Sequence, residues 1–121
     1  MIRLVPAEDI SEIDTMNFIC EFIEYNSIIH GCGGLDRYIN NYNSWLEHLR
    51  EVETREVTEE SVPSFTYFLV RDNYPIGICN IRPYLNESLR RFGGHIGYSI
   101  RPTERQKGYN KINLYLGLKI C

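Results

Sequence analysis

The segment RPTERQKGYNK, residues 101–111, contains the residue types that bind an anion. Pro102 ends the apolar stretch before it, Arg105 and Lys107 supply positive charge, and Gly108 lets the backbone approach a ligand closely. The apolar pattern of the following residues predicts a helix directly after this turn. The unpaired N–H groups and the positive dipole end of that helix would point into the turn. The segment therefore indicates a site for phosphate or pyrophosphate.

The glycine spacing excludes two other phosphate loops. The segment has neither the G-x-x-x-x-G-K-[ST] pattern of a P-loop nor the G-x-G-x-x-G pattern of a dinucleotide-binding turn. One glycine between a strand and a helix is a weak signal, and a turn that binds nothing is the open alternative.

Three strands are expected to position this turn. Residues 95–100, HIGYSI, form the strand before it, in which Gly97 and Ser99 alternate with large residues. Glycine inside a strand often marks a bulge or a close approach of another backbone. Residues 65–72 are apolar and rich in β-formers, which predicts a strand buried on both faces. The turn NYPIG and residues 76–82 complete a hairpin with it.

The first half of the chain predicts one strand and two helices. Residues 2–5, IRLV, are expected to form a strand that Pro6 closes. Three glycines in HGCGG, residues 30–34, mark a loop between the helices. The second helix is expected from Leu35 to Val52, and an acidic connection follows at 53–64. Steps of three and four place one apolar stripe on the first helix, formed by Ile10, Ile13, Met16, Ile19, Cys20 and Ile23.

This order of elements predicts an α+β or mixed α/β layer with helices on the sheet faces. A length of 121 residues fits one domain, residues 1–121. The hydrophobic share of 43% is enough for a core, and the net charge of -3 argues against a nucleic-acid binder. Neither a signal peptide nor an apolar run that could cross a membrane is present. The four cysteines have no disulfide or zinc spacing, so we expect a soluble, cytoplasmic protein with no metal.

The segment GYSIRPTERQKGYNK resembles the acetyl-CoA-binding segment of the GNAT superfamily of N-acetyltransferases. The family pattern is Arg or Gln, two residues, Gly, one residue, then Gly or Ala, and Arg105, Gly108 and Asn110 align with it. Asn110 departs from the pattern, since the family has a smaller residue there. GGHIGYSIRP resembles the fourth strand of the family, and YFLVRDNYPIGICNIRPYLN resembles the second and third strands.

The resemblance implies a GNAT-like mixed sheet flanked by helices and an acetyl-CoA-dependent transfer of an acetyl group to a primary amine. The acceptor would be a small molecule or a peptide amine, and the acidic connection hints at a cationic one. Backbone N–H groups would hold the CoA pyrophosphate, and the pantetheine arm would pair with the strand backbone near Ser99, Ile100 and Arg101. The pyrophosphate-binding residues would be Arg105, Gln106, Lys107, Gly108, Tyr109 and Asn110.

His95 is the candidate general base, since an ordinary histidine pKa of about 6.5 suits proton removal near neutrality. The alternatives are a histidine that is only hydrogen-bonded within the strand, Glu87, or a water relay. Tyr98 and Tyr109 are expected to be packing residues. Trp45, Tyr38 and Tyr42 are expected in the core rather than in an acceptor pocket.

Complete members of this family continue past the last helix of this chain, with further strands and a helix. The resemblance therefore implies the N-terminal portion of the fold, with residues 95–100 at an open sheet edge. We expect such a chain to self-associate, as a homodimer or larger homo-oligomer. The alternative function is a catalytically inactive remnant that at most binds CoA phosphate.

Overall fold

The computed structural model describes residues 1–58, 62–82 and 96–120. His95 and Glu87 lie outside these residues. The described elements are β1 (Ile2–Pro6), α1 (Glu12–Glu24), α2 (Tyr42–Glu53), β2 (Phe65–Arg71), β3 (Tyr74–Ile81), β4 (Ile96–Ile100) and α4 (Tyr109–Ile120). Short 3₁₀ turns occupy Ala7–Asp9, Leu35–Arg37 and Pro102–Glu104.

The described strands form one sheet in the order β1-β2-β3-β4, and every pair in it is antiparallel. An α+β architecture is therefore confirmed, whereas the described strands do not form the mixed sheet that was expected. Two helices separate β1 from β2, so the chain returns to the end of the sheet at which β1 finishes, and the pair is antiparallel. Tight hairpin geometry imposes the same direction on β2 and β3. Within the described part of the chain, β4 forms one edge of the sheet.

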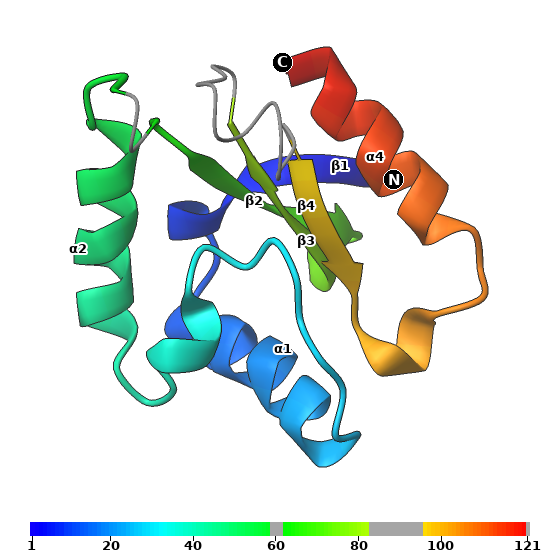
Figure 1. The fold of residues 1–121 in the computed structure, drawn as a ribbon. Helices are drawn as coiled ribbons and strands as arrows, with labels where there is room; N and C mark the ends of the chain where they lie inside the picture. Colours follow the sequence, from blue (N-terminus) through cyan, green and yellow to red (C-terminus); the bar gives the residue numbers. More distant parts are fainter. Residues whose placement is uncertain (59–61, 83–95, 121) are drawn as a thin grey trace.

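Helices cover both faces of the sheet (Figure 1), with α1 and α2 on one side and α4 on the other. On the first side the buried aromatic rings of Phe18, Trp45 and Phe68 pack together. On the second side, Leu69 belongs to a separate apolar cluster with Ile100. Adjacent residues of β2 thus enter opposite layers, which confirms that this strand is buried on both faces.

The expected apolar stripe on α1 was right only in part: Ile19 is buried and Met16 packs against the core. The buried positions are Thr15, Phe18, Ile19 and Phe22, while Ile13 and Ile23 are 81% and 55% exposed. Both sets of residues have helical spacing, so periodicity alone did not separate them. The face with the two phenylalanines removes more apolar area from water, and tertiary packing selects it.

The expected second helix also begins later than its apolar pattern indicated. Leu35–Arg37 is a 3₁₀ turn, Asn40 has a φ of 60°, and α2 starts at Tyr42. Leu35 is nevertheless fully buried in the same core as Trp45. The apolar residues before α2 therefore fill the core from a loop, which the periodicity of the sequence does not distinguish from a helix.

The side chain of Arg101 is buried at the end of β4, with 2% of its surface exposed. Its Nη1 donates to the carbonyl oxygen of Pro75 at 2.8 Å, and its Nη2 donates to Oδ1 of Asn17 at 2.8 Å. Both Nε and Nη2 reach Oε1 of Glu21, at 3.1 and 3.0 Å. The other carboxylate oxygen of Glu21 accepts from the N–H and the hydroxyl of Thr103, each at 2.9 Å. This network joins α1, β3 and the turn after β4.

The Glu21 carboxylate is stabilised in its charged form. Burial by itself would raise the pKa of Glu21, but the hydrogen bonds from Thr103 and Arg101 and the charge of Arg101 outweigh burial and lower the pKa. The folded state therefore holds this carboxylate deprotonated more strongly than the unfolded chain does.

We expect Glu21→Gln to destabilise the protein by about 3 kcal/mol near neutral pH, because the buried Arg101 loses its counter-charge. In the unfolded chain the pKa of Glu21 is about 4.3, and in the folded protein it lies below that value. The carboxylate therefore stabilises the fold fully above the unfolded value and stops doing so as the pH falls through the folded value. Urea unfolding near neutrality and below about pH 4 should show a gap between wild type and variant that narrows in acid.

Glu24→Gln is the matched control, since Glu24 is exposed on the same helix and forms no ion pair with a described residue. It should unfold like the wild type at both pH values. A penalty for Glu21→Gln that does not change with pH would contradict a role for the charge of this carboxylate.

Candidate functional site

The turn between β4 and α4 contains two residues in the left-handed region. Gln106 has a φ of 66° and Gly108 a φ of 82°, and α4 begins directly afterwards at Tyr109. The N–H groups of Gln106, Lys107 and Gly108 donate to no backbone carbonyl of a described residue. The first-turn amides of α4 lack intrahelical acceptors by helix geometry. The turn thus collects unpaired N–H donors at a positive helix end, an arrangement that suits an anion.

Of these residues, Gln106 and Gly108 line a small pocket of about 160 Å³. Its lining residues come from the end of β4, the turn and the first turn of α4: Ile100, Glu104, Arg105, Gln106, Gly108, Tyr109, Asn110 and Lys111. The Asn110 side chain is exposed at the first turn of α4. A Cβ atom on Gly108 would meet nothing within 4 Å, so a ligand could approach this backbone directly.

A carboxylate that sequence reasoning missed also lines this pocket. Oε1 of Glu104 accepts from Nη1 of Arg71 and lies 3.5 Å from Nζ of Lys107. Burial would raise the pKa of Glu104, but the hydrogen bonds and charges of Arg71 and Lys107 outweigh it and lower the pKa. Arg71 also donates to the hydroxyl of Tyr109 at 2.8 Å. Two cations therefore balance one carboxylate beside the turn, which leaves it with a net positive charge.

The side chain of Arg105 is held by protein groups. Its Nε donates to the Ile100 carbonyl at 3.0 Å, its Nη2 donates to Oγ of Ser27 at 2.7 Å, and its guanidinium lies 5.7 Å from the Phe22 ring centroid. Its backbone N–H donates to the Pro102 carbonyl at 3.4 Å. Arg105 therefore fixes the turn against β4 and α1, and the N–H donors begin at the next residue.

The backbone of β4 has groups that face β3 and groups that face away. The N–H of Arg101 donates to the Ile76 carbonyl at 2.9 Å, and Ser99 pairs with Ile78 two residues along. Hydrogen-bonded positions of an antiparallel pair recur every second residue, so Arg101 and Ser99 direct their backbone groups to β3. The N–H of Ile100 therefore faces the outer edge. Of the three residues expected to pair with pantetheine, Ile100 alone offers an outward N–H.

The loop between α1 and α2 packs directly on one face of β4. Oγ of Ser99 accepts from the N–H of His30 at 2.7 Å and donates to the His30 carbonyl at 2.8 Å. A Cβ atom on Gly97 would lie 3.1 Å from Cα of Gly31. This contact confirms that the glycine within the strand marks a close backbone approach.

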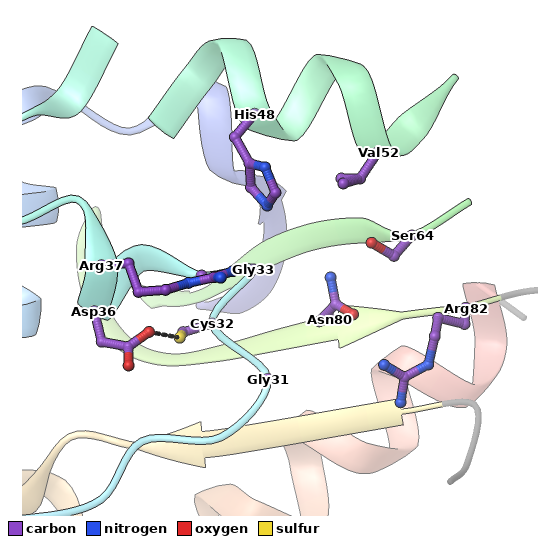
Figure 2. Close-up of a pocket in the computed structure, with 11 residues that line it drawn as sticks. Gly31, Cys32, Gly33, Asp36, Arg37, His48, Val52, Ser64, Asn80 and Arg82 are labelled. Carbon is purple, nitrogen blue, oxygen red and sulfur yellow. Dashed lines mark hydrogen bonds between the residues drawn. The ribbon is translucent and has the colours of Figure 1, made fainter. Parts of the chain in front are cut away.

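A second pocket, of about 380 Å³, lies between this loop, α2 and β3 (Figure 2). Sequence reasoning did not find it, because its residues come from four separated segments. They are Gly31, Cys32, Gly33, Gly34, Asp36, Arg37, His48, Val52, Ser64, Asn80 and Arg82. Gly31 both lines this pocket and touches Gly97, so it lies between the pocket and the middle of β4. The distance along β4 from Gly97 to Ile100, which lines the other pocket, is about 10 Å.

The thiol of Cys32 in this second pocket is not activated. Burial raises its pKa, and the nearby Asp36 carboxylate contributes to the shift. Sγ donates to Oδ1 of Asp36 at 3.4 Å, which requires a protonated thiol. Cys32 is therefore a weak nucleophile near neutral pH.

The expected packing roles are confirmed for four aromatic residues, whereas the half-buried Tyr98 belongs to neither described core cluster and its packing role stays a prediction. Trp45 is fully buried, Tyr38 and Tyr42 pack against the same core, and Tyr109 packs in the cluster under α4. No group of three or more His, Cys, Asp or Glu side chains in the described ranges could hold a metal ion. No helix among the described residues is long and apolar enough to cross a membrane.

No protein-family model, no curated protein and no solved structure matches this chain. The likeness to the GNAT superfamily therefore rests on the motif at residues 94–111 and on the order of elements.

We expect Gly31→Ala to destabilise the fold by about 3 kcal/mol or more. The new Cβ would lie 2.1 Å from the Gly97 carbonyl oxygen, and its three nearest atoms are all backbone atoms, which cannot move aside easily. The φ of 66° at Gly31 adds strain for any other residue. Gly108→Ala is the control, because its φ of 82° is also left-handed but its Cβ would meet nothing within 4 Å. It should cost only about 1 kcal/mol of backbone strain. Urea unfolding of both variants tests the contact, and equal penalties would contradict it.

Proposed function

We propose that the chain is an acetyl-CoA-dependent N-acetyltransferase that acts on a primary amine. The observation that carries the proposal is the cluster of unpaired N–H groups at residues 106–108, placed where the outer edge of β4 meets the start of α4. A phosphate needs those donors, and an extended amide chain attached to it needs an open strand edge.

The described residues fit the diphosphate end of CoA. The N–H groups from Gln106 to Asn110 would hold the pyrophosphate, and Lys107, with Nζ 3.5 Å from Glu104, could turn toward it. No Cβ obstructs the approach at Gly108. Because Arg71 is paired with Glu104, this carboxylate does not oppose the phosphate with a full negative charge. The outward N–H groups of Tyr98 and Ile100 would pair with the pantetheine amides or polarise the thioester carbonyl.

Transfer would be direct, and Cys32 would not act as a covalent nucleophile, since burial and the Asp36 carboxylate keep its thiol protonated. The amine nitrogen bonds to the acetyl carbon, the C–S bond breaks, and the products are an amide and the CoA thiol. A base must first remove a proton from the ammonium group. His95 is proposed for that role.

A second candidate is a chain that binds the CoA phosphates without turnover. The observation that favours it is the position of the Arg105 guanidinium, which donates to the Ile100 carbonyl at 3.0 Å and to Oγ of Ser27 at 2.7 Å. A ligand that runs along the edge of β4 would have to displace this side chain or pass over it.

We expect Gly108→Asp to weaken acetyl-CoA binding by at least about tenfold, because the carboxylate adds bulk and like charge beside the phosphates. Isothermal titration calorimetry with acetyl-CoA measures the affinity. Asn43→Asp adds the same charge on the exposed face of α2 and should bind like the wild type.

A thiol-release assay with a panel of amines separates the two candidates. Binding with thiol release supports the acetyltransferase, and binding without release supports the second candidate. Failure of the wild-type chain to bind acetyl-CoA would contradict both candidates. Unchanged affinity in Gly108→Asp would show that the phosphates lie elsewhere.

Self-association is also proposed. Within the described part of the chain β4 ends the sheet, and Tyr115 and Leu118 on α4 are 58% and 56% exposed. Sedimentation velocity should detect dimers or larger species, and Leu118→Lys should shift them toward monomer, because a charge on this face opposes its burial. A stable wild-type monomer at micromolar concentration would contradict the proposal.

A further inference from the structure

The pocket of about 380 Å³ beside α2 gathers cationic and polar donors from separate elements. Arg37 comes from the 3₁₀ turn, His48 from α2 and Asn80 from β3, with the guanidinium of Arg82 on the same lining. Figure 2 shows His48 pointing from α2 toward the loop, and Asn80 pointing from β3 toward α2. The volume lies in the range of small-molecule sites.

The charges of this lining favour an anion. Arg37 and Arg82 are cationic, whereas Asp36 carries the one carboxylate among the described lining residues. That carboxylate already accepts from Sγ of Cys32 at 3.4 Å. Arg37 has no hydrogen bond or ion pair with any described residue, so its donors are available to a ligand. The pocket therefore combines a guanidinium that has no partner among the described residues with one carboxylate, which accepts a hydrogen bond from Cys32 of the same lining.

Two polar lining residues, His48 and Asn80, are held in position before any ligand arrives. The Arg37 side chain is exposed and lies beside the loop, where a Cβ atom on Gly34 would be 2.8 Å from Nη2. The His48 ring lies 5.5 Å from the Tyr38 ring, centroid to centroid. Asn80 is 7% exposed, and its Nδ2 donates to Oγ1 of Thr66 at 3.0 Å. Groups restrained in this way lose less conformational entropy when they bind.

We infer that this pocket binds the carboxylate of a small molecule, with Arg37 as the recognising residue. The guanidinium presents a planar fork of donors that matches the two oxygens of a carboxylate. On the proposed transfer reaction, which this part of the inference rests on, the ligand is the acceptor, an amine that also carries a carboxylate. Gly31, which lines this pocket, touches Gly97 of the strand assigned to the thioester.

The acidic connection at 53–64 suggested a cationic acceptor, whereas the cationic Arg37 in this pocket favours an anionic group on the acceptor. Of that segment only Ser64 lines the pocket among the described residues, and Ser64 is uncharged. Among the described lining residues, the cationic Arg37 is the group that would select the anionic part of the acceptor.

The anion site is tested without acetyl-CoA, by NMR titration of the ¹⁵N-labelled chain at constant ionic strength. Acetate and acetamide are the probes, because they share a shape and differ in charge. We expect acetate to shift the amides of residues 31–37 and 80, and acetamide to leave them unchanged. Arg37→Gln should weaken acetate binding by about tenfold, the loss expected for one charge-assisted contact. Arg50→Gln, which removes an exposed arginine on α2 outside the pocket, should bind acetate normally.

Equal shifts with both probes, or none with acetate, would overturn the inference, as would unchanged affinity in Arg37→Gln. Shifts with inorganic phosphate alone would also overturn it, because they identify a phosphate site. Circular dichroism checks that each variant is folded.

The acceptor role has its own measurement. Thiol release should be faster with L-phenylalanine than with phenethylamine, which lacks only the carboxylate, and Arg37→Gln should remove that preference. Faster release with phenethylamine would overturn the acceptor assignment. If the chain binds acetate but releases no thiol, the carboxylate site would be supported and the proposed transfer reaction would be contradicted.

Discussion

The buried guanidinium of Arg101 is the interaction on which the arrangement of the site depends. A charge in this position is costly unless every donor is paired, and here Glu21, Asn17 and the Pro75 carbonyl accept from it. Its cation also lies 4.5 Å from the Tyr74 ring centroid. Since Glu21 holds Thr103 as well, one ion pair orients α1, the end of β4 and the first residues of the turn. The direction in which the turn leaves the sheet follows from that pairing.

The second constraint is steric and acts at the middle of β4. Gly31 has no room for a side chain, because its Cβ would lie 2.1 Å from the Gly97 carbonyl oxygen, and a Cβ on Gly97 would be tight against Gly31. Ser99 holds the same loop through both backbone groups of His30. The glycine loop is therefore fixed on one face of the strand, and α4 lies on the other. Ile100 at the end of β4 lines the first pocket, whereas the second pocket is joined to the middle of this strand through Gly31.

Much of the sheet could be predicted from the sequence. Strands at 65–71, 74–81 and 96–100 lie within a few residues of their expected bounds, because apolar β-formers between turn residues are a local signal. The helices were less predictable. Ile13 and Phe18 both fit a helical period, and only the sheet beneath determines which of the two is buried. Leu35 fits a helix by spacing yet fills the core from a 3₁₀ turn, since the chain reverses at Asn40 before α2 starts.

The sequence by itself determined that a glycine, basic residues and the start of a helix are adjacent at 101–111, and the predicted anion site rests on that adjacency. Tertiary structure decided how those residues are used. It committed the Arg105 side chain to Ile100 and Ser27, brought Glu104 beside the turn through Arg71, and turned the N–H of Ile100 outward. It alone created the pocket of Arg37, His48 and Asn80. Those residues lie far apart in the chain. They come together only because α2 and the glycine loop pack on the sheet, and a local sequence pattern cannot indicate such packing.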